Sequence, residues 1–204
     1  ARNAYIVPRM KRMMNRTVWA MTKQLRKGSF KPEGYEVSFG SGKIDRIDTC
    51  ETEDQVYVKI LDYKTGAKSF DMAAFYHGLQ MQLVVYMEEA VRLEERKHPG
   101  KKIVPAGIFY YRMKDPIVGK ELDEEKLEEA ILKELRLDGI IRQEDAVIQR
   151  LDADFSGNSL VIPAGKTKSG YSKASKMLLP EEFDAVLTYA EKRRTDLQGA
   201  MYRG

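Results

Sequence analysis

The stretches "KIDRID" (43–48) and "DYKTG" (62–66) place charged side chains at the ends of two otherwise apolar segments. A charged group at the edge of a buried sheet face is costly unless a partner such as a metal ion compensates it. Asp45, Asp62 and Lys64 therefore need partners that the apolar residues around them cannot supply. We predict that Asp45, near the start of the first segment, and Asp62 and Lys64, at the end of the second, form a metal site together.

The two apolar segments are predicted to pair as an antiparallel hairpin. They cover residues 43–48 and 55–63, and the polar segment "TCETED" joins them. Side chains of a strand alternate between its two faces. One face of the second strand therefore carries three apolar residues followed by a carboxylate and an amine: Val56, Val58, Ile60, Asp62 and Lys64. This order predicts that both charges lie where the strand leaves the core.

The charged residues match the needs of phosphodiester hydrolysis. Asp45 and Asp62 are 17 residues apart, a separation that a hairpin can close. A divalent cation stabilises charge on phosphoryl oxygens and lowers the pKa of an attacking water. Magnesium takes one or two carboxylates as ligands, and a nearby lysine such as Lys64 can orient the nucleophile. The spacing also fits a buried ion-pair network at the strand ends.

The composition indicates one domain with a substantial core. The chain has 204 residues, of which 43% are hydrophobic, and it contains no apolar run long enough to span a membrane. Its single cysteine, Cys50, excludes an internal disulfide and a multi-cysteine metal site within these residues. We expect a reducing, cytoplasmic setting and no membrane. The first residue is Ala1, which fits a fragment of a longer protein.

The charge distribution is asymmetric. Residues 1–32 carry nine Lys or Arg and no acid, whereas the rest of the chain has 26 basic and 31 acidic side chains. A basic segment on a mildly acidic body indicates a polyanion or an acidic surface as partner. The alternative is a solvated helix face whose acidic neighbour is absent from this chain.

The hydrophobic pattern predicts an α/β arrangement on a mixed sheet. Helices are predicted at 8–27 (with Gly28 as C-cap), 71–96, about 122–136 and 179–201; strands at 35–39, 43–48, 55–63 and 103–113; and a loop with one short strand at 152–176. The helix at 71–96 is apolar on most sides, which is typical of a buried helix. We expect helices to flank the sheet, with helical additions at the C-terminal end.

Taken together, these motifs resemble RecB-type PD-(D/E)XK nucleases, and most closely the C-terminal nuclease domain of the B subunit of AddAB/RexAB helicase–nucleases. The resemblance covers most of residues 15–200 and rests on the segments "YEVSFGSG", "GKIDRID", "ILDYKTG", "GLQMQLVVY", "PAGIFYYRMKDP" and "LRLDGII". It implies a restriction-endonuclease-like core and one nuclease domain over residues 1–204, with 1–32 as a basic N-terminal helical segment.

The resemblance also implies roles for the residues of the motif. Asp45 matches the first metal-ligand aspartate of the family, Asp62 the second and Lys64 the motif lysine. Tyr63 occupies the position whose backbone carbonyl commonly completes the metal coordination. These matches imply Mg²⁺, or Mn²⁺, as the cofactor.

Three further residues are candidates for the site. Gln82 and Tyr86 match the "QxxxY" pair that helps to hold the substrate strand, and their i,i+4 spacing predicts one helix face. Gln82 interrupts an apolar stripe, so its side chain needs a partner, for which the Asp–Lys cluster is a candidate. Glu36 is the one residue placed to act as the upstream acid of the site, although it also suits a surface strand. His77 follows the hairpin and does not match that upstream position.

The resemblance implies a magnesium-dependent DNA exonuclease domain of a bacterial helicase–nuclease that acts in double-strand break repair and recombination. Its partners would be DNA and the A subunit of the heterodimer, and an iron–sulfur cluster is possible only in a full-length protein. One alternative is a catalytically inactive, DNA-binding or scaffold module of the same complex. Another is a stand-alone nuclease of the superfamily. The intact Asp…Asp-x-Lys set favours an active enzyme.

Overall fold

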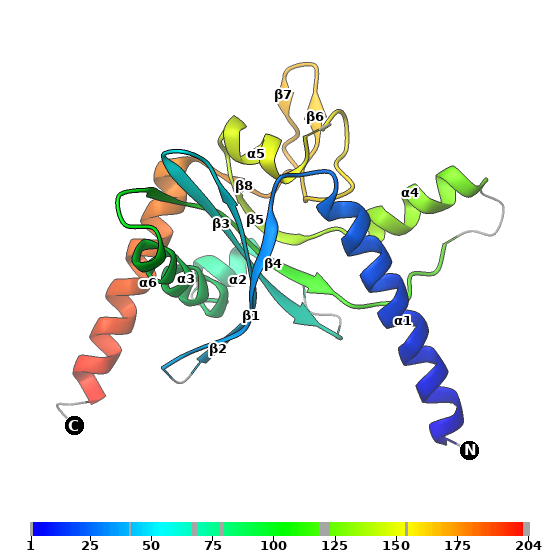
Figure 1. The fold of residues 1–204 in the computed structure, drawn as a ribbon, viewed down its shortest axis with the longest axis horizontal. Coiled ribbons are helices and arrows are strands. Elements are labelled where there is room, and N and C mark those ends of the chain that lie inside the picture. The colour runs from blue at the N-terminus through cyan, green and yellow to red at the C-terminus, as the bar shows by residue number, and fades with distance from the viewer. Residues whose placement is uncertain are drawn as a thin grey trace.

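A six-stranded mixed β-sheet runs through the centre of the molecule (Figure 1), in the order β1-β2-β3-β4-β5-β8. This computed structural model describes residues 2–40, 42–66, 69–77, 80–118, 123–153 and 155–201. The strands of the sheet are β1 (Lys31–Phe39), β2 (Gly42–Glu51), β3 (Gln55–Lys64), β4 (Lys102–Arg112), β5 (Asp138–Arg142) and β8 (Met177–Leu178). A separate two-stranded ribbon pairs β6 (Lys166–Thr167) with β7 (Gly170–Tyr171).

The pairing confirms the predicted hairpin and the predicted fold class, an α/β arrangement with a mixed sheet flanked by helices. Strands β1, β2 and β3 form an antiparallel meander, and β4 then pairs parallel to β3. Strand β5 runs antiparallel to β4, and β8 runs parallel to β5. The parallel β3–β4 pair brings the end of β4 beside the "DYKTG" motif.

Helices lie on both faces of the sheet (Figure 1). They are α1 (Arg2–Leu25), α2 (Met72–Tyr76), α3 (Gln82–Lys97), α4 (Glu124–Glu134), α5 (Asp145–Leu151) and α6 (Pro180–Met201). Helices α3 and α6 pack against each other on one face, while α5 packs on β5 at the opposite face. Within the described ranges, no helix combines the length and hydrophobicity that a membrane crossing requires.

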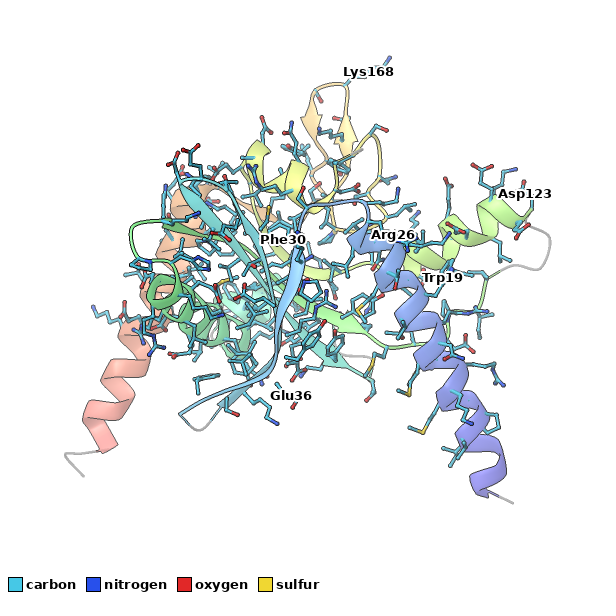
Figure 2. The ribbon with its side chains drawn as sticks, in the orientation of Figure 1. Trp19, Arg26, Phe30, Glu36, Asp123 and Lys168 are labelled. Carbon is cyan, nitrogen blue, oxygen red and sulfur yellow. The ribbon has the colours of Figure 1, made fainter. Side chains whose placement is uncertain are left out.

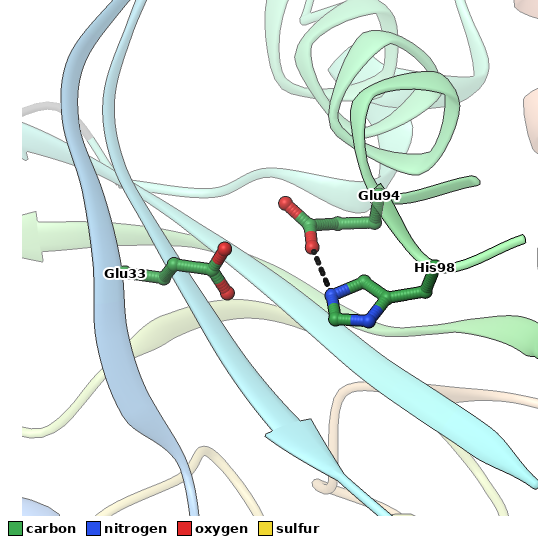
Figure 3. A group of neighbouring side chains, drawn as sticks. All are labelled: Glu33, Glu94 and His98. Carbon is green, nitrogen blue, oxygen red and sulfur yellow. Dashed lines mark ion pairs between the residues drawn. The ribbon is translucent and has the colours of Figure 1, made fainter. Parts of the chain in front are cut away.

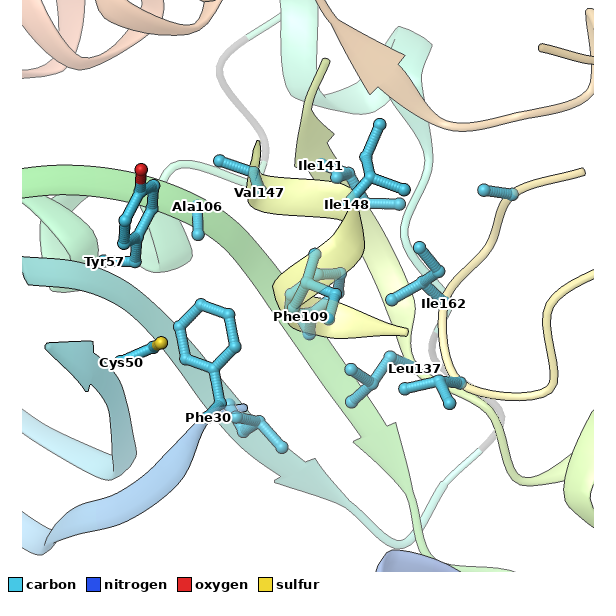
Figure 4. Packing of buried hydrophobic residues seen from close by; sticks show 14 of the residues in the cluster. Phe30, Cys50, Tyr57, Ala106, Phe109, Leu137, Ile141, Val147, Ile148 and Ile162 are labelled. Carbon is cyan, nitrogen blue, oxygen red and sulfur yellow. The ribbon is translucent and has the colours of Figure 1, made fainter. Parts of the chain in front are cut away.

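The alternation along β3 divides the core into two layers. Val56, Val58 and Ile60 share one face, as predicted, and this face packs with the apolar side of α3. Tyr57 and Leu61 face the other way, into the cluster that contains Phe30, Phe109 and residues of α5. Figure 4 shows Tyr57, Phe30 and Phe109 in this cluster. Hydrophobic burial on both faces therefore fixes the strand that carries the predicted site residues.

Several local predictions were wrong. The predicted helix at 71–96 is two helices, α2 and α3, and His77 forms the C-cap of the first. The intervening sequence contains Gly78, which has a low helix propensity. Strand β5 and helix α5 were not predicted because a short apolar run next to a helical pattern carries little periodic signal. The segment 152–176, expected to hold one short strand, contains β6 and β7.

The contact between β4 and β5 leaves no room for a side chain at position 139. A Cβ atom placed on Gly139 would lie 1.9 Å from the carbonyl oxygen of Ile108. We therefore expect Gly139→Ala to lower the free energy of unfolding by about 1–3 kcal/mol, measured by urea denaturation. Gly66→Ala is the control, because a Cβ at Gly66 meets nothing within 4 Å. Equal stabilities of the two variants would contradict this close approach of the strands.

Candidate metal centre

The carboxylates of Asp45 and Asp62 lie on adjacent strands. The β2–β3 ladder ends at the pair Arg46–Leu61, and Asp45 and Asp62 are the next residues beyond that pair on the two strands. Asp45 accepts a hydrogen bond at Oδ2 from the backbone N–H of Tyr63, with an N–O distance of 2.8 Å. The side chain of Asp45 thus takes the place of a backbone acceptor at the end of the ladder.

Lys64 forms an ion pair with Asp62, a contact that the alternative interpretation as an ion-pair network also predicts. Its Nζ atom contacts Oδ2 of Asp62 and lies 5.5 Å from the ring centroid of Tyr110 on β4. Asp62 is only 4% exposed, and its Oδ2 accepts no hydrogen bond in the described part of the chain. A buried carboxylate oxygen with an ammonium contact and no hydrogen bond retains coordination capacity for a further cation.

Glu36 lies across from Asp45 on the neighbouring strand β1. The register pairs on either side, Tyr35–Arg46 and Val37–Ile44, define this position. Figure 2 shows Glu36 on the part of β1 that lies away from Phe30. The side chain is exposed and accepts a hydrogen bond from Lys43 at 2.7 Å. Glu36 also has a φ of 51°, a left-handed conformation that is rare for residues other than glycine.

The register thus places three carboxylates, those of Glu36, Asp45 and Asp62, in a row across β1, β2 and β3. Partial burial raises the pKa of Asp45, and the negative charges of Asp62 and Glu36 raise it further. The hydrogen bond from Tyr63 and the charge of Lys64 lower this pKa, but by less than the other effects raise it. The cations around Asp45 therefore do not fully offset the burial and the negative charges that act on its carboxylate.

The chemistry of this donor set suits a divalent cation, but the ligand atoms of Glu36, Asp45 and Asp62 do not all lie within 4.8 Å of one another. The oxygens are hard ligands, two carboxylates lie on neighbouring strand ends, and the buried Oδ2 of Asp62 has the Lys64 ammonium as its ion-pair partner and accepts no hydrogen bond in the described chain. A bound cation would also offset the burial and the repulsion from Asp62 and Glu36 that together raise the pKa of Asp45. Asp45 and Asp62 would hold it, and Tyr63 would contribute its backbone carbonyl.

Gln82 and Tyr86 share one face of α3, as their spacing predicts. Nε2 of Gln82 donates a hydrogen bond to the hydroxyl of Tyr86 at 2.6 Å. The ring of Tyr86 packs edge-on against Phe39 of β1, with centroids 5.5 Å apart. The hydrogen bond that the structure gives to the Gln82 side chain therefore goes to its helix neighbour and not to the Asp–Lys cluster.

Sequence reasoning did not identify Arg112, which the parallel register places beside Lys64. Ile108 and Tyr110 pack in the layer that contains α3, so alternation along β4 predicts the same face for Arg112. Its Nε atom is buried and donates no hydrogen bond in the described part of the chain. Arg112 is therefore a candidate for binding an anionic substrate next to Lys64.

A second group of side chains could also hold a metal ion. Ligand atoms of Glu33, Glu94 and His98 lie within 4.8 Å of one another (Figure 3). The ammonium of Lys97 lies 2.7 Å from both carboxylates and offsets part of their charge. His98 also lies 3.6 Å from Glu51, at the end of β2 that is remote from the predicted site. None of these residues was predicted as a ligand.

Comparison with known proteins identifies the class to which this chain belongs. The family model described as the PD-(D/E)XK nuclease superfamily matches residues 1–197. The chain therefore belongs to the PD-(D/E)XK nuclease superfamily, which confirms the resemblance found in the sequence and the restriction-endonuclease-like core.

The similar curated proteins are named as B subunits of an ATP-dependent helicase/deoxyribonuclease. The protein of Alkaliphilus metalliredigens (strain QYMF) is 35% identical over 226 residues, which cover 100% of this chain and 20% of that protein. The protein of Lachnoclostridium phytofermentans (strain ATCC 700394 / DSM 18823 / ISDg) is 37% identical over 206 residues, covering 92% of this chain and 18% of that protein. The chain thus spans about a fifth of the length of these relatives.

Proposed function

We propose that this chain is the metal-dependent deoxyribonuclease domain of a bacterial helicase–nuclease, and that it hydrolyses DNA from its ends with Mg²⁺ or Mn²⁺. The observation that carries the proposal is the row of carboxylates on β1, β2 and β3, next to the ion pair between Asp62 and Lys64. The superfamily match and the name of the relatives support it. The proposed setting is double-strand break repair in the cytoplasm, with an A subunit as partner.

A bound divalent cation supplies charge stabilisation on the phosphoryl oxygens and a lowered pKa of water. The residues of the chain provide the rest. Asp45 and Asp62 would hold the cation, and Glu36 would add negative charge at the outer side of the row. Lys64 would orient the attacking water and neutralise charge that develops at the phosphate. Gln82 and Tyr86, which bond to each other, would support the substrate strand.

The basic helix α1 would contribute to DNA binding or to an interface with a neighbouring domain. Part of its charge is used within the chain, because Arg16 lies 3.5 Å from Asp115 and Lys23 lies 2.7 Å from Glu128. The exposed side of the helix also carries apolar residues such as Met10 and Met14. A contact of its remaining Lys and Arg residues with the DNA backbone should weaken as the salt concentration rises.

Metal removal tests the proposal directly. The purified chain should release nucleotides from labelled linear duplex DNA with Mg²⁺ or Mn²⁺, and EDTA should abolish this release. Covalently closed circular DNA of the same sequence is the matched control, since an exonuclease needs an end. Calorimetric titration with Mn²⁺ should show binding in parallel. Cleavage that persists in EDTA, or the absence of both metal binding and cleavage, would refute a metal-dependent nuclease.

A further inference from the structure

A buried polar network lies on the side of β2 and β3 that faces away from the carboxylates. Arg46 donates two hydrogen bonds to Asp48, from Nε to Oδ1 at 2.5 Å and from Nη2 to Oδ2 at 2.8 Å. Lys59 of β3 lies across from Asp48 in the register, with its Nζ 3.4 Å from Oδ2. All three side chains are buried. The network therefore ties the two strands that carry the candidate metal centre to each other.

The network reaches the site through Tyr63. Nη1 of Arg46 donates a hydrogen bond to the Tyr63 hydroxyl at 3.2 Å. The preceding residue, Asp45, accepts the hydrogen bond from the backbone N–H of Tyr63. Two consecutive residues of β2 thus hold Tyr63 at both of its ends, one at the peptide group and the other at the phenol. The two peptide groups on either side of Tyr63 join it to Asp62 and to Lys64, so the position of Tyr63 affects both neighbouring residues.

Helix α1 and a neighbouring aromatic ring restrict the same side chains. Sδ of Met21 lies 3.3 Å from Nη1 of Arg46 and 3.6 Å from the hydroxyl of Tyr63. The ring of Tyr63 packs edge-on against Tyr111, with centroids 6.1 Å apart. Tyr63 consequently has little freedom to change its rotamer without breaking several contacts.

Arg46 stays charged in this environment. Burial lowers its pKa, but the hydrogen bonds and charge of Asp48 outweigh burial and raise this pKa above the ordinary value. A buried guanidinium that binds a carboxylate through two parallel hydrogen bonds has a fixed geometry, because its planar fork matches the carboxylate in one orientation. Because Asp48 fixes the orientation of the guanidinium, it also fixes the direction in which Nη1 of Arg46 donates to the Tyr63 hydroxyl.

We propose that Arg46, oriented by Asp48, is a positioning residue that holds Tyr63 and thereby sets the geometry of the strand ends at the metal centre. Its relevance to catalysis rests on the proposed nuclease function, whereas its effect on the β3 backbone does not. The roles assigned to Asp45, Asp62 and the Tyr63 carbonyl require oxygens at defined places, and residues behind metal ligands commonly fix them.

Tyr63→Phe tests this proposal with a minimal change. It removes the hydroxyl that Arg46 binds and keeps the aromatic ring that packs on Tyr111. Tyr57→Phe is the matched control, because Tyr57 lies on the same face of β3 and also loses a hydroxyl hydrogen bond, to Gln55, but at the far end of the strand. Arg46→Lys is a second test, since an ammonium cannot bind Asp48 in a bidentate manner and reach Tyr63 as well.

The first measurement is the exchange rate of the backbone amide at position 63, followed by NMR in each variant. We expect exchange in Tyr63→Phe and Arg46→Lys to be about tenfold faster than in the parent, with no change in Tyr57→Phe. The second measurement is the Mn²⁺ dissociation constant, expected to rise about tenfold in the same two variants. The cleavage rate at saturating Mn²⁺ should change by less than this.

The outcomes separate this proposal from the proposed function. Unchanged exchange at position 63, or equal acceleration by Tyr57→Phe, would show that the network contributes only to stability and would overturn the proposal. Accelerated exchange in the variants of a protein that neither binds Mn²⁺ nor cuts DNA would uphold the positioning role and refute the nuclease function. Accelerated exchange without any change in Mn²⁺ affinity would refute the link to the metal centre.

Discussion

Asp62→Asn is expected to reduce the rate of metal-dependent DNA cleavage by about a thousandfold or more. The variant loses several kcal/mol of charge stabilisation in the transition state, and each 1.36 kcal/mol lowers the rate tenfold. The substitution keeps the size of the side chain and removes its charge. Asp62 is buried beside Lys64, and in our proposal it is one of two carboxylates that hold the cation. The rate of nucleotide release and the Mn²⁺ affinity measure the effect.

Asp71→Asn is the matched control for this substitution. Asp71 is exposed, and its carboxylate caps α2 by accepting a hydrogen bond from the backbone N–H of Ala74. Asparagine caps helices equally well, so this variant changes one charge and leaves the fold and cleavage unchanged. If Asp62→Asn retains more than a tenth of the parental activity, the assignment of the metal centre is wrong. An inactive scaffold module would require the parent itself to lack cleavage.

Asp48→Asn should have the largest effect on stability. Asp48 is fully buried and is the carboxylate that faces both Arg46 and Lys59. Its neutralisation removes the carboxylate with which Arg46 and Lys59 are each paired, and breaking a buried ion pair in this way typically costs about 3–5 kcal/mol. We expect urea denaturation to show a decrease of this size in the free energy of unfolding, with an unchanged m-value.

Two further variants define the cause of that loss. Burial is the main effect on the Lys59 ammonium; it lowers the pKa of Lys59 and so disfavours the charged form. Lys59→Met removes this second cation. Combining Lys59→Met with Asp48→Asn should therefore recover part of the lost stability, which a double-mutant cycle quantifies. Glu53→Gln, in the exposed turn between β2 and β3, is the control. A loss below about 1 kcal/mol for Asp48→Asn would argue against a fully charged network.

The sequence by itself predicted the central hairpin and the face on which Asp62 lies. The period-2 alternation from Val56 to Ile60 predicts that Val56, Val58 and Ile60 are buried together on one face of the strand, and in the structure they are. The same motif order pointed to the superfamily, which the match over 1–197 confirms. Local patterns succeeded here because neighbouring residues in one strand carry both the core and the charges.

The tertiary structure decided what depends on contacts between distant segments. It placed Glu36 across from Asp45 through the β1–β2 register, and Arg112 beside Lys64 through the parallel β3–β4 register. It also revealed that Arg46 supports Tyr63 from the far side of the sheet. None of these neighbours follows from local spacing, because strand register is set by burial and hydrogen bonding across the whole sheet. The sequence therefore identified the motif, and the packing of the sheet determined the residues that surround it.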